Sequence, residues 1–420
     1  MDRPPSHSAS NPEDLYGNFT VAAAVFCVVL ELGYFYFFLQ ARSPSWALPF
    51  VDGYGYAIGR DFLNTWMGGR AALSGGPAAW FDLATYNAAL LRIVGDPQLV
   101  AHFWSYPPHL LLFIWPVGLL PYLPAYALWC IAGLALYLLA ARAGGAKRKD
   151  MLLLALAPGV FVNVFFGQNG FLTAALLIGG LTNLDRRPTL SGVLLGILTV
   201  KPQFGLLLPV LLVMTGRWRV IAAAVATALA LVALTTFWFG PDIWLEYVRK
   251  VMPQQHWLLT DGSGTLLLMV SSAFVNARLA GLSLEAAWLV QAVSSSCALA
   301  LVVWTFWRRR DPALSLALFV TATFLFSPWM LNYDMVLFGW IVVLLRERTD
   351  GTAADHMLAL AVWLLPLAML VFGVAHIPIA MLVLPVFAGR LVWRLARAEV
   401  RPTVAAEAQA VPVVGLLPLG

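Results

Sequence analysis

The chain has 420 residues, of which 61% are hydrophobic and only 11% are charged, whereas about 45–50% of the residues of a soluble domain are apolar. A soluble globule is therefore excluded, and because a membrane-spanning helix needs ~20 apolar residues, the sequence has enough of them for about a dozen spans. The formal net charge of +5 does not indicate a nucleic-acid partner, because the basic residues occur in short clusters between apolar runs.

The apolar runs predict an all-α, polytopic membrane protein with about 12 transmembrane helices. They lie near residues 19–39, 107–141, 151–166, 170–183, 189–200, 203–215, 220–239, 284–306, 312–326, 335–345, 356–373 and 377–395. Residues 1–18 are expected to be a cytoplasmic tail, and because no cleavage site follows the first run, we expect that run to be retained as a span. Residues 19–398 then form a single membrane domain, and the Ala/Val/Pro-rich residues 399–420 are expected to be a disordered cytoplasmic tail.

Two longer and more polar segments, 40–105 and 240–283, interrupt the apolar runs. Short cytoplasmic loops are enriched in Lys and Arg, so the basic clusters are expected in the cytoplasm. All of them lie there if the N-terminus is inside the cell and residues 107–141 cross the membrane once. The clusters are Arg142/Lys147/Arg148/Lys149, Arg186/Arg187, Arg217/Arg219, Arg308/Arg309/Arg310, Arg346/Arg348 and Arg390/Arg394/Arg397/Arg401. The two long segments are then expected on the outer face.

Three short polar connections are expected on the same face as these segments: FGQNG (166–170), VKPQ (200–203) and SPWMLNYD (327–334). The runs that meet there are too short to cross a hydrocarbon layer of ~30 Å comfortably. Polar groups at such depth are tolerated where they line a water-filled cavity or are buried in protein. The sequence therefore predicts a polar cavity that opens on the outer face beneath the two long segments.

Asp61 is the first candidate for chemistry, in the stretch GRDFLNTWMGGRAALSGGPAAWFD (59–82) directly after Arg60. A carboxylate at such a cavity can act as a general base, because it can accept the proton of a hydroxyl that attacks an electrophile. The alternative is that Asp61 caps the helix after it, since Asp is a preferred N-cap residue. Both interpretations stay open on the sequence alone.

Lys201 lies between apolar residues in TVKPQFGLLLPV (199–210) and is followed by Pro202 and Gln203. An ammonium in this setting is costly unless it meets an anion or water. Lys201 either binds a lipid phosphate as a compact point charge or extends to the interface from a helix end.

Two further groups of polar residues border apolar runs. Gln168 and Asn169 offer donors and acceptors of the kind that bind sugar hydroxyls, although a turn between helices also favours Asn-Gly. Asn332, Tyr333 and Asp334 follow a Ser-Pro pair, and an aspartate so close to an apolar run favours a role in lining the cavity.

The second outer segment contains His256 and Asp261 in MPQQHWLLTDGSG (252–264), which has the features of either a flexible lid or a solvated loop. One His and one Asp do not make a metal site. The sequence has no Walker A motif and no paired carboxylates of the kind that hold the metal of a nucleotide diphosphate. A nucleotide-sugar donor is therefore disfavoured, and no metal or other cofactor is expected.

Four motifs in this order resemble glycosyltransferase family 87, the polyprenol-phosphate-mannose-dependent alpha-1,2-mannosyltransferases. The first is the Asp61 stretch with Trp66, Gly69, Gly75 and the closing residues 80–82. The others are YPPHLLLFIWPVGLLP (106–121), GQNGFLTAALL (167–177) with GVLLGILTVKPQFGLLL (192–208), and SPWMLNYD (327–334). The resemblance covers roughly residues 50–345. Family members often carry His residues after the Ser-Pro turn, where this chain has Asn332, Tyr333 and Asp334.

The resemblance implies a GT-C fold and an inverting transfer of a sugar, mannose in the first place, from a polyprenyl-phosphate donor to a glycolipid or glycan acceptor. It implies an enzyme of the bacterial inner membrane with its active site on the periplasmic face and Asp61 as the general base. The leaving phosphate needs cations nearby. Residues expected to bind the phosphate or the sugar are Arg60, Lys201, Gln168, Asn169, Gln203, Asn332, Tyr333 and Asp334.

The main alternative is a polytopic transporter or flippase of lipid-linked sugars, which would show similar spans and buried polar turns. Transporters often consist of two similar halves, and the sequence shows no internal repeat. A polysaccharide polymerase or ligase would more typically place its chemistry in a large late outer loop, whereas Asp61 comes early. A purely structural protein is disfavoured, because burying Asp61, Lys201 and Asp334 without a function costs stability.

Overall fold

The computed structural model describes residues 12–40, 51–52, 54–97, 99–262, 265–307, 311–346 and 351–400. These residues are predominantly helical and contain no β-strand, only two isolated bridges, Val51 with Ala57 and Val270 with Leu331. The predicted all-α class is confirmed. The basic cluster 308–310, Arg348, and residues 401–420 of the expected tail lie outside the described residues. The first helix, α1 (Pro12–Gln40), begins inside the segment that was expected to be a tail.

Within the described residues, five helices are long and apolar enough to cross a membrane. They are α5 (Tyr122–Ala143), α11 (Trp218–Phe239), α16 (Leu284–Trp307), α19 (Ala353–Val374) and α20 (Ile379–Val400). A sixth span results if Arg148–Ala155, which includes α6 (Met151–Ala155), and α7 (Pro158–Phe166) form one helix bent by 49°. The protein is therefore a multi-pass membrane protein, and segment 107–141 contains one long helix, as the predicted orientation requires.

The other apolar stretches of the described chain are shorter. They are Ala24–Tyr36 within α1, Leu83–Val94 (α3), Pro108–Leu119 (η2, α4 and η3), Gly170–Thr182 (α8), Pro188–Val200 (α9 and η5), Pro202–Met214 (η6 and α10) and Pro312–Phe326 (α17). Helix lengths alone thus support five or six crossings, and the count of about twelve stays a prediction.

Close helix packing is built on small residues. Gly192 and Gly196 lie one turn apart on α9, and a Cβ on Gly192 would lie 2.5 Å from the Cβ of Ala223 on α11. A Cβ on Gly196 would lie 2.7 Å from the carbonyl oxygen of Ala224. Glycines spaced in this way let two helix backbones approach closely, as in membrane helix pairs generally.

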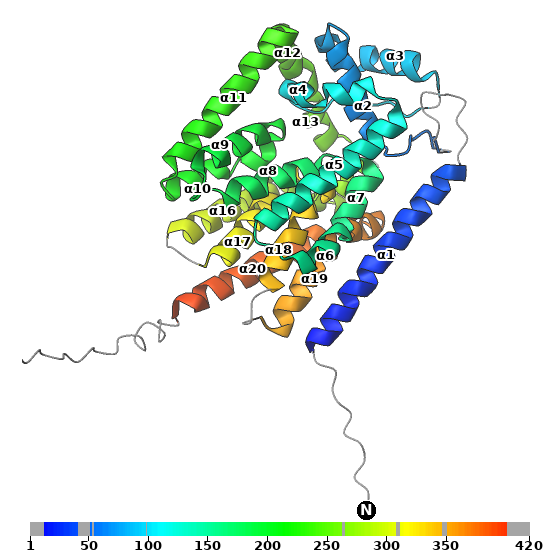
Figure 1. Cartoon of the computed structure of the whole chain (residues 1–420). Helices are drawn as coiled ribbons and strands as arrows, with labels where there is room; N and C mark the ends of the chain where they lie inside the picture. The colour runs from blue at the N-terminus through cyan, green and yellow to red at the C-terminus, as the bar shows by residue number, and fades with distance from the viewer. Residues whose placement is uncertain are drawn as a thin grey trace, which may run out of the picture.

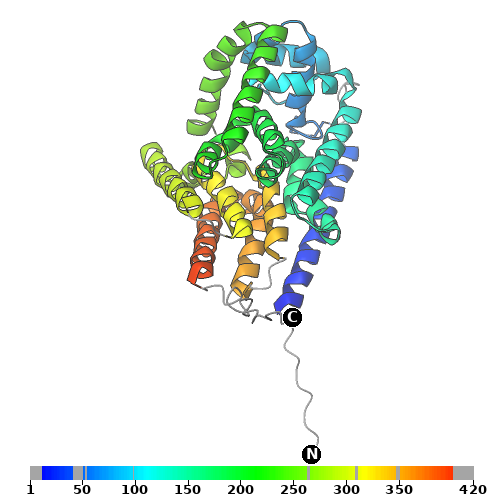
Figure 2. The same cartoon turned by 60° about the vertical axis from the view of Figure 1, so that its left-hand side comes forward.

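Most helices of the two long polar segments gather at one end of the molecule, the end at which α1 terminates (Figure 1; Figure 2). The first segment contains α2 (Phe62–Leu73), η1 (Pro77–Phe81) and α3, and the second contains α12 (Asp242–Glu246), η7 (Tyr247–Val251), α13 (Met252–Thr260), α14 (Thr265–Met269) and α15 (Ala273–Leu279). Lys250 of the second segment lies 3.5 Å from the carboxylate of Asp82 in the first. We call α2, η1, α3, α12, η7 and α13 the outer layer, whereas α14 packs against α19 and α15 against α16.

The outer layer has an apolar core of its own, which fixes α2. Phe62 and Trp66 are buried and pack against the ring of Tyr122. The indole nitrogen of Trp66 donates to the carbonyl oxygen of Leu120 over 2.9 Å. Aromatic side chains bury large areas in a few rotamers, so this core holds the first turn of α2, and Asp61 directly before it, in one position.

Candidate active site

The turn before α2 is held in an unusual backbone conformation. Gly59 and Arg60 have φ angles of 75° and 40°, and left-handed backbone is strained for a residue with a side chain such as Arg. The N–H of Gly59 donates to the hydroxyl of Tyr34 over 2.8 Å, and Tyr122 donates to the carbonyl oxygen of Ile58 over 2.6 Å. Strain at such a position is maintained because the surroundings fix it, which is typical of functional sites.

Asp61 occupies the N-cap position of α2, but its carboxylate makes no capping hydrogen bond. Its Oδ2 instead accepts a hydrogen bond of 2.6 Å from the Nε2 of Gln168. Burial raises the pKa of the Asp61 carboxyl, and the charges of His102 and Arg60 and the bond from Gln168 act in the opposite direction. The capping alternative therefore does not account for this carboxylate.

Gln168 is held on three sides. Its Oε1 accepts from the hydroxyl of Tyr106 over 3.2 Å, and its backbone carbonyl accepts from the indole of Trp129 over 3.2 Å. The preceding Gly167 has a φ of 59°, and a Cβ there would lie 2.7 Å from the carbonyl oxygen of Gly59. The glycine lets the turn between α7 and α8 approach the turn before α2, which brings the amide to Asp61.

His102 is a site residue that the sequence analysis missed. Asn87 of α3 holds its backbone on both sides, with hydrogen bonds of 2.8 and 2.9 Å. The ring Nδ1 lies 2.6 Å from the carbonyl oxygen of Val100, so Nδ1 carries the proton and Nε2 is the acceptor in the neutral ring. Burial lowers the pKa of His102, and the charge of Asp61 opposes that shift. A single His among aromatic residues gives no spacing signal, so only the fold reveals it.

Lys201 and Asp334 form a buried ion pair with an Nζ–Oδ1 distance of 2.5 Å. Nζ also donates to the Oδ1 of Asn169 over 3.3 Å and lies 4.3 Å from the ring centroid of Tyr333. Both ionic side chains are buried, so Lys201 does not extend to the interface. The FGQNG turn thus sends Gln168 to Asp61 and Asn169 to this ion pair.

Arg60 presents a partly free cation beside Asp61. Its Nη2 lies 3.3 Å from the Oδ2 of Asp52, and its guanidinium lies 4.5 and 5.1 Å from the ring centroids of Tyr56 and Phe165. Its Nε is buried without a hydrogen-bond partner in the described part of the chain. A guanidinium with an unused donor is suited to an anion such as phosphate.

Four of the predicted residues do not join this group. Asn332 donates to the carbonyl oxygen of Pro366 in the middle of α19, over 3.0 Å. Gln203 is half-buried and makes no side-chain hydrogen bond to another described residue. His256 and Asp261 are exposed on and after α13. For these last two the solvated-surface alternative fits the structure.

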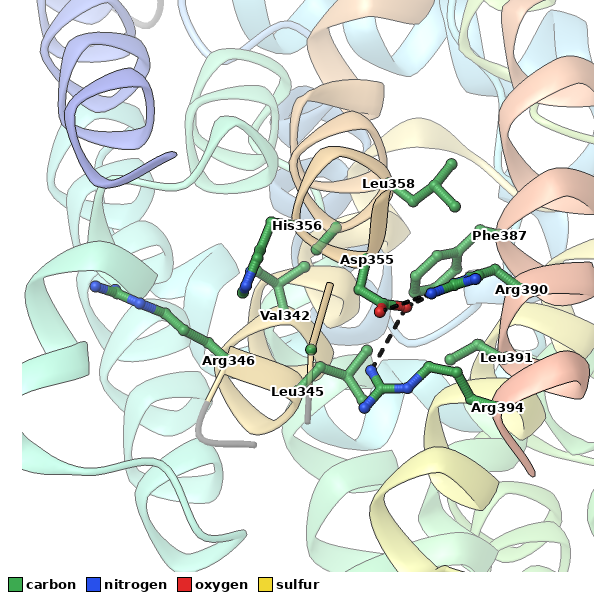
Figure 3. A pocket seen from close by; sticks show the side chains of 12 residues that line it. Val342, Leu345, Arg346, Asp355, His356, Leu358, Phe387, Arg390, Leu391 and Arg394 are labelled. Atoms are coloured by element: carbon green, nitrogen blue, oxygen red, sulfur yellow. Dashed lines mark hydrogen bonds and ion pairs between the residues drawn. The ribbon is translucent and has the colours of Figure 1, made fainter. Parts of the chain in front are cut away.

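Two of the cavities formed by the described residues flank the helices, and neither of these two is lined by Asp61. One lies between α1 and α7 beside Arg60 and has a volume of about 370 Å³. The other, of about 20 Å³, lies where Arg390 and Arg394 of α20 meet Asp355 of α19 (Figure 3). A volume of this size holds about one water molecule, so the second cavity marks an ion-paired helix junction and not a sugar site.

A comparison with protein families matches residues 104–328, more than half of the chain, to glycosyltransferase family 87. The matched segment contains Tyr106, Gln168 and Lys201, whereas Asp61 precedes it and Asp334 follows it, so the grouping of these two with the others rests on the geometry above. The curated proteins and the solved structures that were compared offer no match. The chain belongs to glycosyltransferase family 87, and it is a membrane-embedded glycosyltransferase.

Proposed function

We propose that the protein is an inverting glycosyltransferase of the GT-C type that uses a polyprenyl-phosphate sugar, with mannose as the first candidate. The acceptor is a hydroxyl of a lipid or a glycan. The observation that carries the proposal is the half-buried carboxylate of Asp61, held by Gln168 over 2.6 Å beside the cation of Arg60. Membership of a glycosyltransferase family favours this function over transport of lipid-linked sugars.

The reaction needs a base and an anion site close to each other. The acceptor oxygen attacks the anomeric carbon, and Asp61 takes the proton of the hydroxyl as the new bond forms. The bond between the anomeric carbon and the phosphate oxygen breaks on the opposite face, and polyprenyl phosphate leaves with the electron pair. Arg60 is placed to stabilise the charge that develops on the leaving phosphate.

Lys201 has a different role in this proposal. Two of its three N–H donors are directed to Asp334 and Asn169, and the charge of Asp334 offsets its own. The pair fixes Asn169, whose Nδ2 is buried without a partner in the described chain. A buried donor without a partner is costly, which makes this Nδ2 a candidate to bind a sugar hydroxyl or a phosphate oxygen of the donor.

The distribution of basic residues supports a site on the outer face. Under the positive-inside rule, the clusters in the connections between apolar runs belong to the cytoplasm. The outer layer and Asp61 then face the periplasm of a bacterial inner membrane. Polyprenyl-phosphate sugars, which are membrane lipids, suit a site that opens beside the bilayer.

The experiment compares wild type, Asp61→Asn and Asp82→Asn, each purified and reconstituted in lipid. Polyprenyl-phosphate-mannose is the donor and a membrane glycolipid extract the acceptor, and release of polyprenyl phosphate is measured. Asp61→Asn is expected to lower turnover by about 10²–10⁴-fold, the usual contribution of a general base. Asp82 is the matched control, because this exposed carboxylate caps α3 through the N–H of Thr85, and Asp82→Asn is expected to keep turnover.

The three proteins should unfold at similar temperatures, since the side-chain amide oxygen that Asp61→Asn leaves in place can still accept the hydrogen bond from Gln168. Turnover by Asp61→Asn close to that of wild type would rule out Asp61 as the base. If the enzyme consumes a different polyprenyl-phosphate sugar and not the mannose donor, the assignment of mannose is wrong but the proposed mechanism is unaffected.

A further inference from the structure

The larger cavity is an apolar groove between two helices that ends at a cation. It is lined by Val29, Leu30, Gly33 and Tyr34 of α1, by Phe161 and Phe165 of α7, and by Arg60. Helix α1 lies along the flank of the molecule beside α7 (Figure 1). Its Val29 and Leu32 are exposed, so this side of the molecule faces the hydrocarbon of the bilayer.

Gly33 keeps the middle of this groove open. A Cβ built on Gly33 has no heavy atom within 4 Å among the described residues. Glycine within a helix costs about 1 kcal/mol relative to alanine, and here no neighbouring backbone demands it. The missing side chain leaves space on α1 where any other residue would project into the groove.

The polar end of the groove is rigid and adjoins the candidate base. Tyr34 donates to the carbonyl oxygen of Phe165 over 3.1 Å and accepts from the N–H of Gly59 over 2.8 Å. This hydroxyl joins α1, α7 and the turn that carries Arg60 and Asp61. An apolar chain in the groove would therefore end beside the side chain of Arg60, which lines the groove and is 21% exposed.

The charges around the groove favour an anionic head group at this end. Asp52 neutralises Arg60 in part through Nη2, and Asp61 interacts electrostatically with it, but the side chain of Arg60 stays partly exposed at the groove. Glu31 of α1 interacts electrostatically with Tyr34, which lines the groove, and with Cys130 and Tyr126 of α5, but it does not itself line the groove.

We infer that the groove between α1 and α7 binds the first isoprenoid units of a polyprenyl phosphate, with the phosphate at Arg60. The inference rests on the proposed function and deepens it by placing the lipid part of the donor. The groove supplies apolar walls for the unsaturated chain, and Arg60 supplies the counter-charge. The anomeric carbon, one bond beyond the phosphate, then lies on the side of Asp61.

The test uses binding and not transfer, so it is independent of which sugar the enzyme takes. The probe is undecaprenyl phosphate with a photoactivatable diazirine in its first isoprenoid units, added to the full-length protein in phosphatidylcholine nanodiscs. After irradiation, mass spectrometry locates the label. We expect it on peptides of α1 and α7, in wild type and in Asp61→Asn alike.

Gly33→Trp fills the groove, and its matched control is Gly389→Trp on α20. Gly389 is also a helix glycine whose built Cβ has no heavy atom of the described chain within 4 Å, but it lies outside the groove. Gly33→Trp is expected to lower labelling of α1 and α7 about tenfold, which corresponds to ~1.4 kcal/mol of binding free energy, and Gly389→Trp to leave it unchanged. Gly33→Leu, a smaller change, is expected to give an intermediate loss.

Labelling of Gly33→Trp at the wild-type level, or a label confined to other helices, would overturn the inference. Equal competition by dioleoylphosphatidic acid would also overturn it, because the groove would then be a general lipid site. If the groove is labelled but the protein consumes no polyprenyl-phosphate sugar, the groove is a polyprenyl-phosphate site and the proposed transfer is refuted.

Discussion

The pKa of Asp61 decides in which pH range the proposed base can work. Burial raises this pKa, and His102, Gln168 and Arg60 oppose the shift without removing it. A base must be deprotonated to accept a proton, so transfer is expected above the raised pKa and is lost as pH falls through it. A profile of kcat/KM against pH should show an acid limb with a midpoint above ~3.9, the ordinary value for aspartate.

His102 provides the control for this profile. Protonated His102 favours ionised Asp61, and glutamine carries no charge, so His102→Gln is expected to move the acid limb to higher pH to the extent that the ring is protonated where Asp61 titrates. His256 is exposed on α13, and His256→Gln is expected to leave the limb in place. A limb at the ordinary aspartate value in wild type would contradict Asp61 as the titrating base.

For single residues, the sequence predicts which polar side chains are important but not which residues they contact. Lys201 and Asp334 stand out because charges in apolar runs are costly, yet they are 133 positions apart and nothing in the sequence pairs them. From the sequence alone, capping is the more frequent role for an aspartate such as Asp61, and only the bond from Gln168 separates it from the catalytic interpretation. His102 could not be predicted, because its position depends on the clamp by Asn87.

Among the elements, the turn between α7 and α8 is the one on which the site depends most directly. Gly167 has a φ of 59°, and a Cβ there would overlap the Cβ of Phe62 and approach the carbonyl oxygen of Gly59 to 2.7 Å. Gly167→Ala is therefore expected to push Gln168 away from Asp61 and to lower kcat at least tenfold. The kcat is measured by sugar transfer, and the stability by thermal unfolding, both with the reconstituted variant.

Gly216 is the matched control for Gly167. It has a similar φ of 68°, and its built Cβ meets no heavy atom of the described residues within 4 Å. Gly216→Ala shares the backbone strain of about 1–2 kcal/mol without the steric overlap, so it should lose stability and keep kcat. Equal loss of kcat in both variants would show that the effect is general destabilisation.

The helix breaks at the three polar turns could be predicted from the sequence. Helix α7 ends at Phe166 and α8 begins at Gly170, η5 ends at Val200 before Pro202, and α17 ends at Phe326 before Ser-Pro. Glycine in the left-handed region and proline stop helices for local reasons. The helices of the outer layer were not predicted as such, because they are held by tertiary packing around Phe62 and Trp66.

Over the whole molecule, charged side chains join distant parts of the chain at two levels. Lys201 and Asp334 link the turn after α9 to η8 (Asn332–Met335) deep inside. Asp355 links α19 to Arg390 and Arg394 of α20 at the other end (Figure 3). The sequence could predict that charges border the apolar runs. It could not predict how many runs cross the bilayer, because the length of a short apolar helix does not decide whether that helix spans the membrane.

The buried pair yields a prediction that separates a structural role of Lys201 from direct binding of the donor phosphate. Lys201→Met leaves the charge of Asp334 buried without its partner and is expected to lower the free energy of unfolding by about 3–5 kcal/mol. Adding Asp334→Asn removes that charge, so the double variant should recover much of the loss. The coupling energy of the pair is obtained by measuring the unfolding of wild type, the two single variants and the double variant in mixed micelles. The exposed pair of Asp185 with Arg217 is the control, and it is expected to contribute under about 1 kcal/mol. If Lys201→Met unfolds like wild type but no longer binds polyprenyl phosphate, Lys201 contacts the donor directly, and the phosphate site extends from Arg60 towards the ion pair.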